Sequence, residues 1–323
     1  MAKKRSFFHY KQSKKVSWLV LLAGFLCIGA IIFFGLSYSS FHSHPSHTPA
    51  VPSLLSKSPL PSPAPYPTNV TGVYPGEEIT ARGVVVMDVD SHVYVYKRNE
   101  TLSLSPASTT KLLTALVALD VYKPDDVVTI ASNSAGGQVV GLVAGEKVTV
   151  ENLLYGALIH SGNDAAIALA EFYPDGMEAF IDRMNEKAKE LHMEESHFTN
   201  PMGFDGSEHK VTPLDLSLLA LAAIQNKTIA KMVAIPQITI SDVTHTYFHK
   251  LNNVNQLLGK IPGVAGIKTG WTEAAGENLI TYVERNGRKI IFVVLHSKDR
   301  FGDTTKLIDW VFENYRWEDA MNN

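Results

Sequence analysis

The sequence is nearly free of cysteine. Cys27 is the only one among 323 residues, and it lies within an apolar segment near the N-terminus. A single cysteine excludes an intramolecular disulfide and any metal site built from cysteine ligands. The fold must therefore depend on an ordinary hydrophobic core.

A strong charge of one sign is also missing. The formal net charge is only −3 at pH 7, so the chain lacks the basic field that attracts nucleic acid, and we expect no nucleic-acid partner. His42, His44 and His47 are close enough in sequence to chelate a metal, but their polar, proline-rich surroundings favour a plain linker. We accordingly expect no metal and no organic cofactor.

Charged side chains are absent from residues 16–36. At about 1.5 Å per residue, a helix of this length spans the roughly 30 Å hydrocarbon core of a bilayer. Residues 1–15 contain six Lys or Arg and no acid, which orients the N-terminus toward the cytoplasm. We therefore expect a cytoplasmic basic tail at residues 1–15, a transmembrane anchor at residues 16–36, and the remainder outside the cytoplasmic membrane.

A cleaved signal peptide is the alternative for the apolar segment. The apolar region of a signal peptide usually has about 7–15 residues and ends at an A-x-A-like site. Here the run is longer, and Gly35-Leu36-Ser37-Tyr38-Ser39 is a poor cleavage site. The sequence thus favours an anchor that stays attached.

Residues 37–75 are rich in Ser, Pro and His, with prolines at alternate positions from Pro59 to Pro67. Such a segment tends toward extended polyproline conformations and cannot bury a core. It predicts a semi-rigid stalk between the membrane and the rest of the chain. Residues 76–323, which have a globular composition, are predicted to form one folded domain.

Hydrophobic periodicity and turn signals predict the elements of this domain. Strands are expected at residues 82–89, 92–98, 127–130, 237–241, 264–269, 278–285 and 289–296. Helices are expected from Ser108 onward and at residues 148–159, 165–172, 176–192, 212–223 and 304–315. Asn286-Gly287, between the last two strands, is a strong hairpin signal. This order indicates the α+β class, with an antiparallel sheet flanked by helices and preceded by one transmembrane helix.

One apolar helix begins near Ser108, with Lys111 three residues further on. The free N–H groups and the dipole at a helix start favour a developing alkoxide. Lys111 falls on the same helical face, so Ser108 is a candidate nucleophile and Lys111 its candidate base. The spacing is common by chance, and Ser207 to Lys210 repeats it. A helix cap beside a surface lysine is therefore the alternative for this pair taken alone.

Two further motifs follow in order. Ser161-Gly162-Asn163 is the only S-x-N triplet and lies at a break between two predicted helices, while residues 268–270 form the only K-T-G, at the end of a predicted strand. Each motif alone is weak. Together, S-x-x-K, S-x-N and K-T-G in this order are the signature of class A β-lactamases and penicillin-binding proteins.

The phrases around these motifs extend the similarity, at residues 160–166, 199–203, 266–272 and 275–279. From about residue 78 to 315 the chain resembles the serine-type D-Ala-D-Ala carboxypeptidases, the low-molecular-mass penicillin-binding proteins of peptidase family S11. The resemblance implies a β-lactamase/transpeptidase-like fold and a penicillin-binding catalytic domain at residues 76–323. It also implies a peptidoglycan stem peptide as substrate, and β-lactams as covalent inhibitors that acylate Ser108.

Physical chemistry suggests roles for the motif residues in attack on a peptide carbonyl. Ser108 is the nucleophile, and Lys111 takes its proton when burial and the like charge of Lys268 make the amine neutral. Ser161 relays that proton toward the leaving amine. Asn163 holds the backbone of the substrate.

The K-T-G strand is expected to bind the substrate. Lys268 and the Thr269 hydroxyl attract its C-terminal carboxylate, and Gly270, without a side chain, lets the peptide lie along the strand as an added one. The resemblance implies that the oxyanion is held by the backbone N–H groups of Ser108 and Trp271.

The chain departs from the family pattern at two positions. Trp271 follows K-T-G, where relatives often carry His or another polar or aromatic group. Because the backbone N–H is what the chemistry needs there, we expect the chemistry to survive and substrate entry to change. Val254 stands where some relatives use Arg to bind the carboxylate. Arg300, just after the last strand, is a candidate replacement, and a surface arginine is the equally compatible alternative.

These observations favour a membrane-anchored serine D,D-carboxypeptidase that removes the terminal D-Ala of peptidoglycan pentapeptides. A D,D-endopeptidase acting on cross-links is the nearest alternative. A β-lactamase-like hydrolase is disfavoured because no E-x-x-L-N phrase lies between Ser161 and Lys268. A non-catalytic wall-binding module is disfavoured because the nucleophile and both lysines are present.

Overall fold

The computed structural model of the chain describes residues 64–131 and 135–318. The predicted basic tail, the predicted anchor and the part of the predicted stalk before residue 64 lie outside these residues. Within the described part, no helix combines the length and the apolar character that crossing a membrane requires.

Along the chain, strands come first, a block made mostly of helices follows, and strands return before a late helix, as the sequence predicts. The strands are β1 (Tyr66–Asn69), β2 (Gly83–Asp88), β3 (Tyr94–Arg98), β4 (Val127–Thr129), β5 (Lys147–Thr149), β6 (Gln237–Ser241), β7 (Phe248–Asn252), β8 (Val264–Thr272), β9 (Gly276–Arg285), β10 (Arg288–Ser297) and β11 (Tyr315–Glu318). The helices are η1 (Ala107–Thr110, 3-10), α2 (Lys111–Val121), α3 (Val150–Leu158), α4 (Asn163–Glu171), α5 (Gly176–Glu190), α6 (Pro213–Gln225), α7 (Lys227–Val233) and α8 (Arg300–Asn314).

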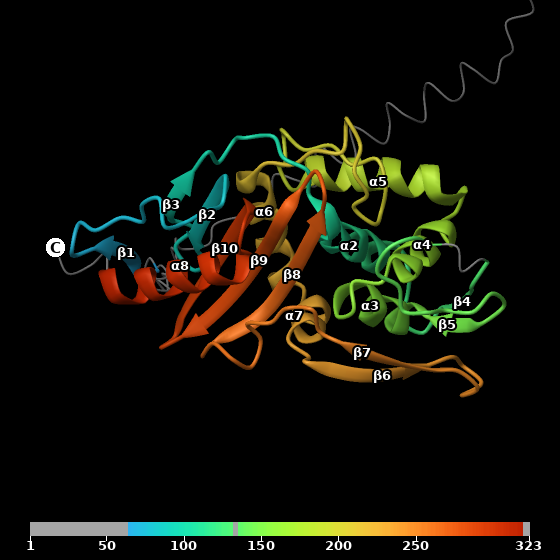
Figure 1. Ribbon diagram of the computed structural model, residues 1–323. Coiled ribbons are helices and arrows are strands. Elements are labelled where there is room, and N and C mark those ends of the chain that lie inside the picture. Colours follow the sequence, from blue (N-terminus) through green and yellow to red (C-terminus); the bar gives the residue numbers. More distant parts are fainter. Residues whose placement is uncertain (1–63, 132–134, 319–323) are drawn as a thin grey trace, which may run out of the picture. The chain divides into compact units, whose positions relative to one another are not determined.

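The main sheet has five antiparallel strands in the order β3-β2-β10-β9-β8 (Figure 1). Its strands come from both ends of the domain, which confirms the predicted α+β arrangement. The β9–β10 turn has Asn286 at φ 54° and Gly287 at φ 71°, the positive angles that a two-residue hairpin of this kind requires.

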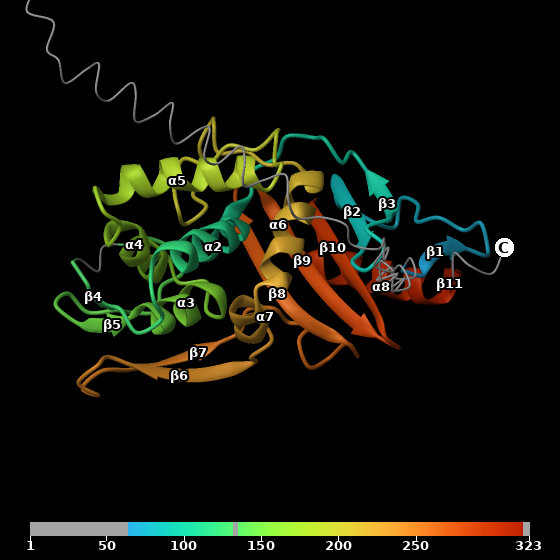
Figure 2. The ribbon, with the colours of Figure 1, turned by 180° about the vertical axis from the view of Figure 1, so that it is seen from behind.

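Both faces of this sheet are covered, which explains the continuous apolar run at residues 290–295 of β10. Ile291 and Val293 pack into the core on the side of α2 and α6, while Phe292 and Val294 pack into the core on the side of α8. Successive side chains of a strand point to opposite faces, so two cores require a continuous apolar run. Figure 1 shows α8 in front of the sheet and α6 behind it, and Figure 2, seen from the opposite side, shows α6 in front.

Helix α2 lies at the centre of the helical layer. Its residues from Lys111 to Ala118 are buried, and it contacts α3, α4, α5 and α6. A helix that is apolar on all sides is a buried one. The short helix η1, which leads into α2, packs directly against β8. The beginning of α2 and the K-T-G strand are thereby brought together.

The sequence does not predict several of the short elements, among them β1. Residues 66–69, which the sequence places in the stalk, pair antiparallel with β11, Tyr66 opposite Glu318 and Asn69 opposite Tyr315. The segment after β1 is held to α8 by the hydrogen bond that Trp310 Nε1 donates to the Val73 carbonyl. The folded part of the chain therefore starts before residue 76. Long-range pairing, which local composition does not report, stabilises this strand.

Candidate active site

Ser108 lies in η1, one residue after Ala107, whose φ is +49°. Its side chain caps neither η1 nor α2, because no side-chain cap bond is present at either helix start. Instead, Ser108 Oγ lies 2.8 Å from the Nζ atom of Lys111. The interpretation of this pair as a helix cap beside a surface lysine is therefore wrong, since Lys111 is fully buried.

The hydrogen bonds of Lys111 hold its amine beside the nucleophile. Nζ lies 2.7 Å from Asn163 Oδ1 and 2.7 Å from the Met202 carbonyl oxygen, besides its contact with Ser108. The amide and carbonyl oxygens only accept, whereas the hydroxyl can also donate. An ammonium can donate to all three oxygens, and a neutral amine, with two N–H donors and one lone pair, also satisfies them when Ser108 donates its proton to Nζ.

Electrostatics favour the same neutral form. Burial, followed by the positive charge of Lys268, lowers the pKa of Lys111 well below its usual value, and the carboxylate of Asp164 opposes this shift in part. Burial and then the charge of Arg300 lower the pKa of Lys268 to about 7. Two buried ammonium groups in one site are costly, because neither is solvated and each repels the other.

Ser161 connects the helical layer to the sheet. Lys268 Nζ donates to Ser161 Oγ over 2.8 Å and to the Thr269 carbonyl over 3.1 Å. Ser161 has φ +62°, a left-handed conformation that costs a non-glycine residue about 1–2 kcal/mol. Because Lys268 occupies an acceptor position of the hydroxyl, the Ser161 O–H remains able to donate toward the cavity that the residue lines.

Asp164 holds the loop that covers Asn163. Its carboxylate accepts the backbone N–H groups of Val140, Gly141 and Leu142 over 2.8–3.1 Å. Asn163 in turn donates from Nδ2 to the Gly136 carbonyl over 2.6 Å. That bond orients the Asn163 amide so that its oxygen points at Lys111. Asp164 lies within residues 160–166, which resemble the family, but its residue type and position alone indicate no role.

The absence of a side chain at Gly270 also has a packing consequence that the sequence does not predict. A Cβ atom at this position would lie 3.0 Å from the Ala107 Cβ, 3.0 Å from the Ser108 nitrogen and 3.1 Å from the Pro106 carbonyl oxygen. The missing side chain therefore lets β8 pack against the loop that carries Ser108. Asn278 supports the same loop from β9, since its Nδ2 donates to the Ser105 and Pro106 carbonyls over 2.9 and 3.1 Å.

Arg300 belongs to the site and is not a plain surface residue. Its Nη1 donates to the Gly270 carbonyl over 2.7 Å, and its guanidinium lies 4.9 Å from the centre of the Phe301 ring. Its side chain lines the same cavity as Thr269 and Val254. Val254 is aliphatic and brings no charge to the wall of this cavity. Arg300 and the buried Lys268 bring cationic groups close to Thr269.

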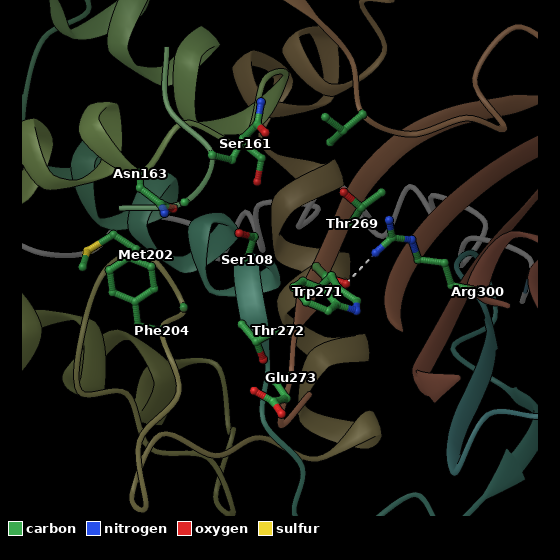
Figure 3. Close-up of a pocket in the computed structure, with 15 residues that line it drawn as sticks. Ser108, Ser161, Asn163, Met202, Phe204, Thr269, Trp271, Thr272, Glu273 and Arg300 are labelled. Atoms are coloured by element: carbon green, nitrogen blue, oxygen red, sulfur yellow. Dashed lines mark hydrogen bonds between the residues drawn. The ribbon is translucent and has the colours of Figure 1, made fainter. Parts of the chain in front are cut away.

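A cavity of about 570 Å³ joins these elements, with Ser108, Ser161, Thr269 and Trp271 in its wall (Figure 3). The predicted site residues are thus brought together, although Lys111 and Lys268 are buried behind the wall. The second S-x-x-K match, Ser207 to Lys210, does not line this cavity. Among the described residues, no group of three His, Cys, Asp or Glu side chains is arranged to hold a metal ion.

Solved structures show the same architecture. The crystal structure of the Streptomyces K15 DD-transpeptidase matches with a TM-score of 0.69 and 32% identity, covering 75% of this chain and 99% of that one. The structure of an evolved penicillin-binding protein homolog from Mycobacterium tuberculosis matches with a TM-score of 0.70 and 31% identity, covering 76% and 96% of the two chains. The domain therefore has the α+β fold of transpeptidases and β-lactamases.

The sequence comparisons identify the family. Residues 69–299 match the family model described as Peptidase S11, D-alanyl-D-alanine carboxypeptidase. The chain belongs to this family, which confirms the predicted resemblance. D-alanyl-D-alanine carboxypeptidase DacF of Bacillus subtilis strain 168 is 33% identical over 245 residues, covering 73% of this chain and 63% of that protein. A D-alanyl-D-alanine endopeptidase of Escherichia coli K12 is 30% identical over 243 residues, covering 72% and 78%. The chain thus spans less than two thirds of the Bacillus relative.

Proposed function

We propose that this protein is a serine D,D-carboxypeptidase that removes the terminal D-Ala of peptidoglycan pentapeptides through an acyl-enzyme on Ser108. The observation that carries the proposal is the position of the buried Lys111 Nζ, 2.8 Å from Ser108 Oγ, where burial and the charge of Lys268 lower the lysine pKa and favour a neutral amine that can receive the Ser108 proton. Membership of the S11 family and relatives named carboxypeptidases give the substrate class.

Acylation begins when Ser108 Oγ passes its proton to Lys111 and attacks the carbonyl carbon of the penultimate residue. The oxyanion that forms would accept from the backbone N–H groups of Ser108 and Trp271. Support for this pair comes from the close approach of β8 to η1, where the Gly270 Cβ position lies 3.0 Å from the Ser108 nitrogen. Such preorganised donors typically contribute about 3–4 kcal/mol to transition-state stabilisation.

The C–N bond then breaks, and the leaving amine of D-Ala takes a proton through the Ser161 hydroxyl. Lys268, Thr269 and Arg300 would hold the D-Ala carboxylate during this step. Water next attacks the ester carbonyl, its proton passes to Lys111, and the Ser108 oxygen leaves with a proton. The products are D-Ala and the shortened peptide, and no cofactor takes part. A β-lactam would acylate Ser108 in the same way.

The chemistry is proposed to take place outside the cytoplasmic membrane, with the chain anchored by residues 16–36. The sequence supports this through the uncharged run and the basic residues that precede it. The D,D-endopeptidase activity is a second candidate, because two relatives, 32% and 30% identical, are named D-alanyl-D-alanine endopeptidases.

The decisive experiment uses the full chain in detergent micelles, with Ser108→Ala as control. Mass spectrometry after incubation with penicillin should find the adduct on the peptide that contains Ser108 and none in the control. Release of D-Ala from a D-Ala-D-Ala peptide, compared with cleavage of a cross-linked muropeptide, separates carboxypeptidase from endopeptidase. A protein that is folded by circular dichroism but forms no adduct would contradict the proposal.

A further inference from the structure

Trp271 has a large side chain that stays outside the hydrophobic cores. It directly follows the K-T-G motif, is 64% exposed, and lines the cavity beside Ser108. Its backbone N–H is a proposed oxyanion donor, a role that any residue type could fill. The indole itself therefore has no part in the chemistry described so far, and the surfaces around it decide what it does.

The pleat of β8 determines on which side of the strand the indole lies. Successive side chains of a strand point to opposite faces. Lys268 points toward the helical layer, where it bonds to Ser161. Thr269 points the other way: it pairs with Leu279 of β9, which packs into the core on the side of α8. Trp271, two residues after Thr269, shares that face, so both side chains lie on the α8 side of β8.

Arg300, the first residue of α8, reaches β8 at the same level. Its backbone N–H donates to Glu277 Oε2 over 2.9 Å, and Glu277 lies directly opposite Trp271 in the pairing of β8 with β9. Its Nη1 donates to the Gly270 carbonyl over 2.7 Å. Figure 3 shows Trp271 between Ser108 and Arg300. The indole thus stands beside the guanidinium group, at the end of the cavity that would hold the carboxylate of the leaving residue.

The leaving residue of a bound peptide would meet this indole. Its carboxylate would lie at Thr269 and Arg300 while the scissile carbonyl lies at Ser108. Trp271 is two residues from Thr269, roughly 7 Å at the strand rise of about 3.3 Å per residue. A tryptophan side chain has only two rotatable bonds and forms a large, rigid surface. A leaving residue with a methyl side chain fits beside such a wall, whereas a leaving amine that belongs to a second peptide has to extend past it.

We propose that the Trp271 indole determines specificity for the leaving group and restricts it to a small residue such as D-Ala. The proposal rests on the proposed carboxypeptidase function and deepens it. The same ester to Ser108 would form and the same C–N bond would break with any leaving group, but a bulky leaving residue collides with the indole. Steric exclusion of the wrong substrate is a common source of specificity. The indole would accordingly favour release of D-Ala over cleavage of cross-links.

The test compares two peptides that differ only in the leaving residue. The full chain in detergent is given Nα,Nε-diacetyl-Lys-D-Ala-D-Ala and the same peptide ending in D-Leu, and release of the last residue is measured. We expect kcat/KM to be at least about tenfold higher for D-Ala. In Trp271→Ala this ratio should fall toward one, and Trp271→Phe, with a smaller ring, should give an intermediate ratio. Cleavage of a cross-linked muropeptide should rise relative to D-Ala release in Trp271→Ala. Phe248→Ala is the matched control, because Phe248 is also 64% exposed but lies outside the cavity, and it should keep the wild-type ratio.

Penicillin acylation distinguishes failure of this proposal from failure of the proposed function. Because a ratio is measured, a general loss of rate in a variant cancels. If penicillin acylates Ser108 and D-Ala is released, but the ratio is one in the wild type or is unchanged in Trp271→Ala, the role of the indole is overturned and the carboxypeptidase stands. If Trp271→Ala does not fold, the ratio in Trp271→Phe decides in the same way. If the folded wild type neither forms the adduct nor releases D-Ala, the proposed function itself fails, and the role of the indole with it.

Discussion

The Nζ atom of Lys268 donates a hydrogen bond to Ser161 Oγ over 2.8 Å, although the two residues are 107 positions apart in the chain. The bond joins the K-T-G strand to the break between α3 and α4 and aligns two of the three motifs. The third motif is tied to the second by Lys111, which contacts Asn163 over 2.7 Å. The three short motifs therefore act as one hydrogen-bonded unit.

Ser161→Ala should slow penicillin acylation and D-Ala release by about 10²-fold, the effect typical of a lost proton-transfer group. The hydroxyl is the group through which the leaving amine would be protonated, and alanine leaves that path empty. Stopped-flow acylation measures the rate, and thermal melting checks the fold. Ser207→Ala, which removes an exposed hydroxyl, is the control. A Ser161→Ala rate within twofold of the wild type would exclude the relay.

The pH dependence of kcat/KM for a D-Ala-D-Ala peptide should have an alkaline limb near pH 7. Burial and Arg300 lower the pKa of Lys268 to about 7, so the free enzyme loses this cation as the pH rises through that value. The peptide carboxylate then binds less well. On the acid side, kcat/KM should fall when Lys111 becomes protonated, since only the neutral amine accepts a proton. A rate that climbs steadily from pH 7 to 9 would contradict the assignment of Lys268.

Gly270→Ala should impair acylation more than folding. The added methyl would press on Pro106, Ala107 and the Ser108 nitrogen at 3.0–3.1 Å, so the nucleophile must move. We expect acylation to slow by at least about tenfold, which corresponds to about 1.4 kcal/mol in the barrier. Gly206→Ala is the matched control, because its Cβ would meet ordinary contacts of 3.5 Å. Equal acylation rates in the two variants would show that the close approach is not required.

Asp164→Asn should lower the free energy of unfolding and shift the acid limb of the pH profile of penicillin acylation. The amide keeps one acceptor oxygen in place of two, so bonds to the 140–142 loop are lost, at about 1–3 kcal/mol. Removing this carboxylate also removes the interaction that raises the pKa of Lys111. The acid limb of penicillin acylation should therefore move to lower pH. Chemical unfolding and a pH profile measure the two effects, and a limb that moves to higher pH would count against the coupling.

The buried His209 should make the folded protein less stable in acid. Its Nδ1 accepts the Thr199 N–H over 2.9 Å and its Nε2 bonds the Thr110 hydroxyl over 3.0 Å. Burial, then the charge of His197, lowers the pKa of His209 to about 4 from 6.5. A lowered histidine pKa means that the unfolded chain binds the proton first. Stability is therefore complete above pH 6.5 and falls by about 3 kcal/mol as the pH drops to 4.

The measurement for His209 is urea unfolding at pH 7 and pH 4, in the wild type and in His209→Gln. Glutamine does not titrate, so the difference between the two proteins isolates the contribution of His209 from that of the carboxylates. The wild type should lose about 3 kcal/mol more than the variant over this range. An equal loss in both would mean that His209 is not the group that titrates.

The elements that position the site were largely predictable because their signals are local. Thr212 caps α6 through the Asp215 N–H, with Pro213 in the first turn, and Asn286-Gly287 forms the predicted hairpin. Among the strands that the sequence missed, β1 and β11 are short, and each depends on its partner at the other end of the domain. Partners so distant in sequence leave no periodic pattern in either segment.

The sequence by itself determined the chemical groups of the site: a serine with a lysine three residues on, a second serine with an asparagine, and the K-T-G strand. These groups are read from residue type and spacing alone. Tertiary structure decided what surrounds them. The Met202 carbonyl lies 91 positions from Lys111, and Arg300 reaches the Gly270 carbonyl from 30 positions away. Burial and the spacing of charges, which set the pKa values of both lysines, arise only when such distant segments pack together.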